Sequence, residues 1–394
     1  MAKLTVEALD LQGKKVFLRA DLNVPLADGA VADDTRLQAV LPTIQYCLKG
    51  GASVILASHL GRPKGKADLK YSLAPVARRL EELLGQSVPL APNCIGEAVE
   101  AQVRQLEPGR LLLLENLRFH PEEESNDAAF ARALARLADC YVNDAFAAAH
   151  RAHASIEAIT RYLSPAVAGL LMRRELEALG RILERAERPL VAILGGAKVS
   201  DKLALVQSLL DRVDTLLVGG AMAFTFLAAL GHGVGRSLVD RERIDFARQA
   251  MAQASRRGIP ISLPVDTVVA ESPEGGVGRA VGIRQIPDHL MGLDIGPLTV
   301  ARFTQALRGA RTVVWNGPMG AFESPPFAQG TFGVARAVAA CGGFTAVGGG
   351  DTAAAVNQAG VADKIGYVST AGGAFIEFLE GRTLPGVAAL TERS

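Results

Sequence analysis

This sequence of 394 residues lacks an excess of charge of either sign, since 42 Lys and Arg stand against 41 Asp and Glu. Proteins that bind nucleic acids or membrane surfaces usually carry a strong basic excess, so neither kind of partner is expected. Long apolar runs are missing too, because no window reaches the ~18 uncharged apolar residues of a membrane span. The opening stretch MAKLTVEALDLQGKK has no apolar signal-peptide core, so we expect no targeting segment.

Cysteine is rare, and the cysteines form no C-x-x-C pair. Scattered cysteines of this kind are typical of buried thiols in a reducing compartment rather than of disulfides or a zinc site. Together with the missing membrane span, they predict a soluble, cytoplasmic protein. The four cysteines are Cys47, Cys94, Cys140 and Cys341.

The P-loop pattern G-x-x-x-x-G-K-S/T is also missing. A different glycine turn, GGAKVSDK at 195–202, lies between the apolar run PLVAILGG and the helical pattern KLALVQSLLDRV. Lys198 and Lys202 are four residues apart, so we expect them to begin a helix and to share one of its faces. A lysine at a helix N-terminus interacts unfavourably with the helix macrodipole, at a cost of about 0.3–1 kcal/mol for each lysine. An anionic ligand bound at the lysines would offset this cost.

The sequence is rich in short, continuous apolar runs of Val, Ile and Leu, each followed by a turn. Continuous runs indicate strands buried on both faces, as in parallel sheets. Helical patterns such as 73–85 and 127–138 lie between them, which predicts an α/β fold with doubly wound parallel sheets. The expected strands are 14–20, 52–58, 110–116, 139–145, 189–196, 214–220, 258–266, 311–318, 344–351 and 366–373.

The length of the chain favours two domains, with three as the alternative, and the segment 164–187 is the best candidate for the boundary. It has a helical period and is longer than the neighbouring helical patterns. Ser164 fits an N-cap and Pro165 fits the first helical position. We therefore expect a helix that joins two sheets.

Basic side chains follow the expected strands of the first half. Ligands of open parallel sheets bind beyond the carboxyl ends of the strands, and arginine forks suit carboxylate and phosphate oxygens. One such arginine alone is more often a solvated surface residue, but several at one sheet edge predict an anion site. Asp21 and Asn23 lie among them and can orient an arginine or accept a substrate hydroxyl. The basic residues are Arg19, Arg36, His59, Arg62, Arg118, His150 and Arg151.

Glycine takes the place of arginine at the strand ends of the second half, in LGG, VGG, NGPMG, VGGGDT and TAGG. Glycine lets backbone amides approach a ligand, and helix N-termini favour phosphates. These turns predict a nucleotide site, with Asp351 near a metal ion carried by the phosphates. His150 and His153 have a spacing that suits metal ligands, but no Glu or Cys nearby completes a set, so we expect a hydrogen-bonded histidine pair.

The ordered motifs RADLNVP, HLGRP, LENLRF, HRAHAS, LGGAKVSDK, MGLDIGP, WNGPMGAFE, GGGDT and STAGGAFIEFLEG resemble those of phosphoglycerate kinases. The resemblance extends from about residue 14 to residue 386. It implies two Rossmann-like doubly wound domains that face a central cleft and are joined by an interdomain helix at 169–187. In that family the N-terminal domain, here 1–168 with the tail 376–394 packing back on it, binds 3-phosphoglycerate or 1,3-bisphosphoglycerate. The C-terminal domain, here 188–375, binds Mg-ADP or Mg-ATP.

The resemblance also implies the reaction, a reversible phosphoryl transfer between 1,3-bisphosphoglycerate and ADP, and a monomer that closes by hinge bending with Mg²⁺ as its metal. It leaves glycolysis, gluconeogenesis and carbon fixation open as the pathway. Lys202 would hold the nucleotide phosphates, while Lys198 and Arg36 would reach the migrating phosphoryl group. Carried over by position, the phosphoglycerate contacts are Asp21, Asn23, Arg36, His59, Arg62, Arg118 and Arg151. The nucleotide contacts are Lys202, Gly292, Glu323 at the ribose hydroxyls, Gly349, Gly350, Asp351 near magnesium, and Thr352.

Some positions depart from the family pattern. Ala147 and Ala148 stand where Gly-Thr is usual, Ala371 where a third glycine is usual, and Arg382 where lysine is common. We expect an ordinary negative φ at Ala371, because a positive φ is costly for alanine. Two alternatives stay open at this point: a non-catalytic nucleotide- or anion-binding protein, and another acyl-phosphate kinase that acts on acetate or carbamate.

Overall fold

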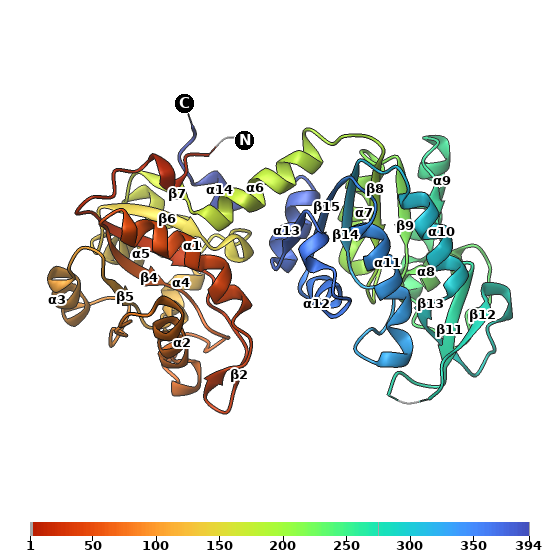
Figure 1. Cartoon of the computed structure of the whole chain (residues 1–394), viewed down its shortest axis with the longest axis horizontal. Helices are drawn as coiled ribbons and strands as arrows, with labels where there is room; N and C mark the ends of the chain where they lie inside the picture. The colour runs from red at the N-terminus through yellow and green to blue at the C-terminus, as the bar shows by residue number, and fades with distance from the viewer. Residues whose placement is uncertain (1–2, 275, 394) are drawn as a thin grey trace. The chain divides into compact units, whose positions relative to one another are not determined.

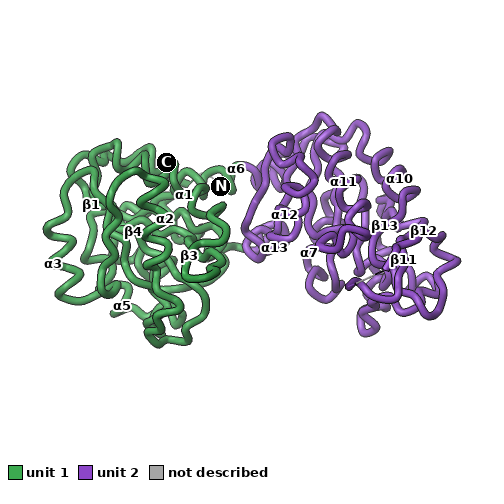
Figure 2. The backbone as a smooth tube through the Cα atoms, turned by 60° about the horizontal axis from the view of Figure 1, so that its bottom comes forward, with its two compact units in different colours: residues 1–177, 383–394 green, residues 178–382 purple. Residues whose placement is uncertain are grey.

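The computed structural model describes residues 3–274 and 276–393, and its chain forms two compact units (Figures 1 and 2). Unit 1 comprises residues 1–177 and 383–394, and unit 2 comprises residues 178–382. Each unit has its own parallel sheet. The last segment of the chain therefore belongs to the unit in which the chain begins.

The sheet of unit 1 has five strands, and all neighbouring strands are parallel. Every residue of β4 is buried, as expected for a strand covered on both faces. Numbered along the chain, the strands lie in the order 3-2-1-4-5, so the order reverses between β1 and β6. In sheet order the strands are β5 (Leu111–Leu113), β4 (Ser53–Ala57), β1 (Lys15–Ala20), β6 (Cys140–Asp144) and β7 (Ala166–Ala168).

Helices connect these strands, because a parallel pair needs a crossover of a dozen or more residues. The predicted helices over 73–85 and 127–138 are confirmed as α2 and α5. Apolar side chains of α1 and α2 pack on the sheet around Leu18 and Val54. The helices are α1 (Thr35–Lys49), α2 (Ala74–Leu84), α3 (Glu97–Gln105), α4 (Pro121–Glu124), α5 (Ala128–Ala135) and α14 (Pro385–Ala388), and a hairpin pairs β2 (Leu26–Ala27) with β3 (Ala30–Val31).

The prediction that a helix starts at Ser164 is wrong. Ser164 and Pro165 are joined by a cis peptide bond, and the residues after them form the edge strand β7, which pairs with β6. The joining helix, α6 (Leu170–Leu183), begins after Gly169, and the division between the two units falls within it. A Ser-Pro pair can precede a strand as well as a helix. Here the residues after it form a strand, because they pair with β6.

The first turn of α6 is held by Asp144, the last residue of β6. Asp144 Oδ1 accepts a hydrogen bond from the amide of Met172 (2.9 Å), and Asp144 Oδ2 accepts one from Thr43 Oγ1 (2.5 Å). Thr43 Oγ1 in turn accepts from the amide of Leu170 (3.0 Å). Burial raises the pKa of this carboxyl to about 6. A glycine is required at 169, because a Cβ there would lie 2.2 Å from Asp144 Oδ1.

Unit 2 contains a six-stranded sheet whose neighbouring strands are all parallel. Numbered along the chain, these strands lie in the order 3-2-1-4-5-6, and the order reverses between β8 and β14. This is the strand order of dinucleotide-binding doubly wound sheets, whose ligands bind at the reversal. In sheet order the strands are β10 (Ile261–Ser262), β9 (Thr215–Val218), β8 (Leu190–Leu194), β14 (Thr312–Asn316), β15 (Phe344–Gly348) and β16 (Tyr367–Ser369).

A second, antiparallel sheet in unit 2 was not expected from the sequence. Its strands, in sheet order, are β12 (Arg279–Gly282), β11 (Asp266–Ala270) and β13 (Met291–Ile295). Among the helices of this unit, α10, α11 and α12 pack side by side, while α7 packs on α9 and α13 (Figure 1). The helices are α7 (Leu203–Leu210), α8 (Met222–Ala229), α9 (Ile244–Arg256), α10 (Pro297–Leu307), α11 (Gln329–Ala339), α12 (Gly350–Gln358) and α13 (Gly372–Leu379).

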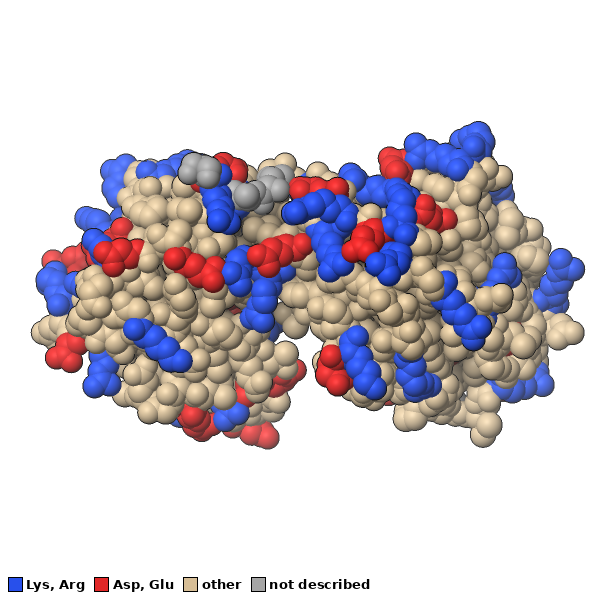
Figure 3. Space-filling model, turned by 45° about the horizontal axis from the view of Figure 1, so that its top comes forward, with Lys and Arg blue, Asp and Glu red and all other residues tan. Residues whose placement is uncertain are grey.

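The surface carries both signs of charge. On the face shown in Figure 3, Lys and Arg are interspersed with Asp and Glu, in agreement with the net charge of +1. Within the described residues, none of the helices combines the length and the apolar character that crossing a bilayer requires.

Candidate active site

Asp21 and Asn23 follow β1 directly and organise two neighbouring segments of unit 1. Asp21 Oδ2 accepts a hydrogen bond from Nη1 of Arg36 (2.8 Å), which lies in the first turn of α1. Asn23 Oδ1 accepts one from the amide of Gly61 (2.8 Å), in the loop after β4. The Arg36 side chain is 33% exposed. Asp21 therefore orients a guanidinium group that an anion can still reach.

His59 lies just beyond the end of β4 and is buried. Its Nδ1 faces Nη2 of Arg19 at 3.2 Å. Burial lowers the pKa of the His59 imidazole well below its ordinary value, and neighbouring arginines, Arg19 above all, lower it further. His59 is therefore neutral at pH 7.

Arg118 adds a guanidinium group that is held from both sides. It lies in the 3₁₀ turn after β5, where its Nη1 donates to the carbonyl of Gly61 (2.9 Å) and its Nε lies 3.1 Å from Glu124 Oε1. Burial lowers the pKa of Arg118 from its ordinary value, while Glu124 acts against this change. Arg62, next to Gly61, is exposed. We call the three arginines Arg36, Arg118 and Arg151, together with the neutral His59 among them, the cationic edge.

The segment after β6 carries Arg151 and the two histidines of HRAH. Arg151 Nε donates to His150 Nε2 (3.0 Å), and His153 Nδ1 lies 3.9 Å from Glu123 Oε1. Burial and the nearby arginines, first among them Arg19, lower the pKa of His153 to about 3. In the part of the chain that the structure describes, no group of three or more His, Cys, Asp or Glu side chains could hold a metal ion. His150 thus accepts a hydrogen bond from Arg151 of the cationic edge, and His153 lies beside Glu123.

In unit 2, Lys202 lies where the strand order reverses between β8 and β14. Its Nζ donates to the carbonyls of Gly195 (2.8 Å) and Asn316 (3.2 Å), at the carboxyl ends of these two strands. Burial lowers the pKa of Lys202 to about 8, although the carboxylates of Asp201 and Asp351 act in the opposite direction. A buried cation whose hydrogen bonds, among the described residues, go to two carbonyls is suited to receive an anion.

Asn316 is a site residue that the sequence analysis missed. Its Nδ2 donates to the carbonyl of Gly348 (2.7 Å), whereas its buried Oδ1 has no hydrogen-bond partner among the described residues. Gly317, with φ 92°, must stay glycine, because a Cβ there would clash with the backbone carbonyl of Gly195. A polar residue at the end of a buried strand was the signal that identified Asp21, and it would have identified Asn316 as well.

The prediction that Lys198 and Lys202 share a helix face is wrong. A 3₁₀ turn begins at Ser200 and α7 at Leu203, so Lys198 precedes both and is exposed in the loop after β8. The amide of Ser200 donates to Asp240 Oδ2 (3.0 Å), which fixes the start of the turn. The two lysines therefore differ in burial, since one lies against the sheet and the other faces solvent.

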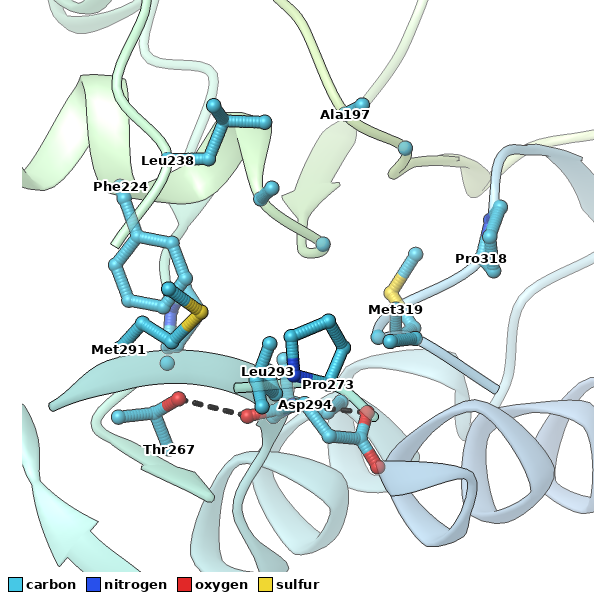
Figure 4. Close-up of a pocket in the computed structure, with 18 of the residues that line it drawn as sticks. Ala197, Phe224, Leu238, Thr267, Pro273, Met291, Leu293, Asp294, Pro318 and Met319 are labelled. Carbon is cyan, nitrogen blue, oxygen red and sulfur yellow. Dashed lines mark hydrogen bonds between the residues drawn. The ribbon is translucent and has the colours of Figure 1, made fainter. Parts of the chain in front are cut away.

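A cavity of about 510 Å³ opens beside these loops. Figure 4 shows Phe224, Leu238 and Met291 on one side of it and Met319 on the other. Gly292 forms part of its wall, and a Cβ there would lie 2.1 Å from Phe224 Cζ. A mostly apolar cavity of this size suits a planar ring system such as a nucleoside base.

The polar side chains of the cavity are few. Glu323 and Asp351 line it and are exposed. Asp294 lies in the wall, where its Oδ2 accepts from the amide of Gly330 (2.6 Å). Burial raises the pKa of Asp294 to about 8, so this carboxyl supports the wall and α11 rather than offering a charge to a ligand.

The GGGDT turn presents a helix N-terminus to the same region. Gly349 has φ 101° and precedes α12, which starts at Gly350. Thr352 Oγ1 accepts from the amide of Gly317 (2.8 Å) and ties this turn to the end of β14. Asp351, in the first turn, is a single exposed carboxylate. That arrangement fits Mg²⁺, which takes one or two protein carboxylates and otherwise waters and substrate phosphates.

The departures from the family pattern fall at positions without backbone strain. Ala371 has φ −83°, which confirms the negative φ expected for it, and precedes α13. Ala147 and Ala148 lie in a 3₁₀ turn, Phe146–Ala148. Alanine adopts both conformations freely.

The comparisons with known proteins agree over the whole chain. A family model described as phosphoglycerate kinase matches residues 6–382. Proteins named phosphoglycerate kinase from Moorella thermoacetica and Pelotomaculum thermopropionicum are 57% and 56% identical over 394 residues, with 100% of each chain covered. The solved structure of phosphoglycerate kinase from Coxiella burnetii is similar with a TM-score of 0.89 and 43% identity, and the match covers 98% of both chains.

Proposed function

The chain belongs to the phosphoglycerate kinase family, and on this premise we propose which substrate each of its two units binds. The family and the close relatives show the activity, which is reversible phosphoryl transfer between 1,3-bisphosphoglycerate and ADP to give 3-phosphoglycerate and ATP. A non-catalytic binding protein and a kinase for acetate or carbamate, the two alternatives left open by the sequence, have no support from these matches.

Unit 1 binds the phosphoglycerate. The cationic edge supports this assignment, because a ligand with a phosphate at one end and a carboxylate at the other needs several forked donors. Arg36 is oriented by Asp21 and remains reachable, so it meets the end of the substrate at which the phosphoryl group is exchanged. The proposed contacts are Asp21, Asn23, Arg36, His59, Arg62, Arg118 and Arg151.

Unit 2 binds the nucleotide. One observation carries this assignment: the buried Lys202 at the strand reversal lies beside a mostly apolar cavity of about 510 Å³. The base and ribose occupy the cavity, and the phosphates lie at Lys202 and at the N-terminus of α12. The proposed contacts are Lys202, Gly292, Glu323 at the ribose hydroxyls, Gly349, Gly350, Asp351 and Thr352.

Asp351 would hold the Mg²⁺ that accompanies the nucleotide phosphates. The position of the Asp351 carboxylate supports this assignment, because it is exposed in the first turn of α12, where the helix N-terminus favours phosphate. When bound, Mg²⁺ would neutralise charge on the nucleotide phosphates.

The protein groups act by position and charge rather than by proton transfer. The acceptor is a carboxylate, already ionised at neutral pH, so no general base is required. A loose phosphoryl transition state needs alignment and positive charge around the moving group. Arg36 supplies that charge from unit 1, and Lys198, exposed in its loop, supplies it from unit 2. Lys202 holds the nucleotide phosphates.

Because the two substrates belong to different units, transfer requires the units to approach each other. In-line transfer needs the reacting atoms within about 3–3.5 Å, and water must be excluded. We infer a hinge at α6 and at the return of the chain near residue 382. Both half-sites lie on one chain, which supports a monomer, and the four unpaired cysteines support a cytoplasmic location.

A coupled assay tests these assignments. The protein is incubated with Mg-ATP and 3-phosphoglycerate, acetate or carbamate, and ADP release is followed with and without a magnesium chelator. Turnover is expected with 3-phosphoglycerate alone and only in the presence of magnesium. Comparable turnover with acetate would overturn the assignment of the cationic edge, because acetate lacks the second anionic group that this edge is proposed to bind.

A further inference from the structure

A chain of buried polar groups lies beneath the cationic edge of unit 1. Arg19 on β1 is 1% exposed, and Ser155 and Glu123 are fully buried. Arg19 Nε donates to Ser155 Oγ (2.8 Å), and the hydroxyl and amide of Ser155 donate to the two carboxylate oxygens of Glu123 (2.6 and 2.9 Å). On its other side, Arg19 Nη2 lies 3.2 Å from His59 Nδ1. This chain links α4 to the histidine of the cationic edge.

Arg19 determines the direction of the hydrogen bonds that the side chains of Ser155 and His59 make in this chain. A guanidinium group can only donate. Ser155 Oγ must therefore accept a hydrogen bond from Arg19, and its own O–H donates a hydrogen bond to Glu123. For the same reason His59 Nδ1 must accept, so it carries a lone pair and no proton. A neutral imidazole with an unprotonated Nδ1 has its proton on Nε2.

The charges around His59 also oppose its protonation. They come from β1, from the turn after β5 and from the segment after β6, so the imidazole faces positive charge from several elements. Burial is the largest influence that lowers its pKa. Burial raises the pKa of Glu123, the carboxyl group of this chain, while Arg19 and the hydrogen bonds from Ser155 act in the opposite direction. The charged and titratable groups that act on His59 are Arg19, Arg118, His153 and Arg151.

We propose that Glu123, Ser155 and Arg19 are positioning residues that fix His59 in the Nε2–H tautomer, so that it binds phosphoglycerate as a neutral hydrogen-bond donor rather than as a cation. The proposal rests on the assignment of His59 to the phosphoglycerate site. A donor whose proton is fixed in place offers the same hydrogen bond across the physiological pH range. An imidazole free to exchange tautomers would present an acceptor to the anionic substrate for part of the time.

The tautomer is measured by ¹⁵N NMR of the imidazole nitrogens in the full-length protein without substrate. The chain has six histidines, and the signals that disappear in His59→Gln assign this residue. We expect a single neutral form with an unprotonated Nδ1 from pH 6 to 8. A His59 that is protonated on Nδ1, or that titrates in this range, would overturn the proposal even if no variant could be made.

Ser155→Ala removes the link between Arg19 and Glu123 without removing a charge. We expect Nδ1–H to appear at His59 and the KM for 3-phosphoglycerate to rise about tenfold, the scale of one hydrogen bond to a charged group. The KM for ATP should not change. Ser53→Ala is the matched control, because Ser53 is also buried in unit 1 and its hydroxyl bonds a backbone carbonyl, that of Leu106. Ser53→Ala should change neither the NMR signals nor either KM.

Arg19→Lys provides a second variant if Ser155→Ala does not fold. Lysine keeps the charge but cannot donate from two nitrogens in different directions, so the same mixed tautomer is expected. Wild-type NMR signals and a wild-type KM in both variants would overturn the proposal. If the wild-type protein shows the expected tautomer but His59→Gln binds 3-phosphoglycerate normally, the site assignment fails and the positioning network stands separately.

Discussion

Replacing Lys202 with methionine is expected to change how the stability of unit 2 depends on pH. Burial lowers the pKa of Lys202 from 10.5 to about 8 in the folded protein, and unfolding restores water to the ammonium group. Between about pH 8 and 10.5 the unfolded chain therefore binds more protons at this position than the folded chain does. Stability rises with pH in that window, and below pH 8 the full cost of burying the charged ammonium group is present.

The size of the effect follows from the two pKa values. At about 1.36 kcal/mol per pH unit, the interval between 10.5 and about 8 corresponds to about 3 kcal/mol. Methionine does not titrate, so the variant lacks this contribution. The free energy of unfolding of the wild type, minus that of Lys202→Met, should therefore increase by about 3 kcal/mol from pH 7 to pH 10.5. Other titrating groups cancel in this difference.

Urea unfolding, followed by tryptophan fluorescence, measures the free energy of unfolding of the wild type and of Lys202→Met. The chain has one tryptophan, Trp315, which is fully buried on β14 beside Asn316 and therefore reports on unit 2. Lys364→Met, at an exposed position of the same unit, controls for the loss of a lysine. A difference that stays constant within about 1 kcal/mol, or that decreases with pH, would refute the reasoning that burial lowers the pKa of Lys202 in the folded protein.

Three further predictions concern catalysis and motion. Arg36→Ala should lower kcat about 10³-fold, the scale for losing a transition-state cation; a normal kcat with a raised KM in the coupled assay would make Arg36 a binding residue only. Ala371→Gly should leave kcat within about threefold, because the φ of −83° at this position suits either residue; a larger change in the same assay would contradict a relaxed turn. The radius of gyration from small-angle X-ray scattering should decrease when both substrates are bound and change little with either alone. An unchanged radius under conditions of full turnover would exclude closure.

The alternation of strands and helices was predictable from the sequence because it depends on local composition. Runs such as SVILA in β4 and LVAIL in β8 are continuous and apolar, and residues with this pattern are stable only when both faces of the strand are covered. The chain then needs a helix for each parallel crossover. Since parallel strands end at one edge, the residues that follow them, among them Arg36 and Asp351, could be predicted from the order of residues as candidates for binding sites.

The local sequence signals did not predict the start of α6 at Leu170, because the group that caps it is distant in sequence, whereas the family resemblance implied a helix from residue 169. Asp144 precedes Met172 by 28 residues, and only the folded sheet brings its carboxylate to the first turn of the helix. The local Ser164-Pro165 signal indicated a start that the pairing of β7 with β6 excludes. The antiparallel strands β11 to β13 escaped detection for a related reason, since several of their residues are partly exposed and their register depends on one another.

The sequence by itself determined which residue types stand at each strand end, whereas the tertiary structure decided their environment. Lys198 and Lys202 look alike in GGAKVSDK, yet one is exposed and the other is buried against the carbonyls of two strands. Arg19 and His59 are 40 residues apart, and the contact of Arg19 Nη2 with His59 Nδ1 leaves Nε2 as the nitrogen of a neutral imidazole that carries the proton. Burial and long-range hydrogen bonds set pKa values and tautomers, and both depend on contacts that exist only once the sheets have formed.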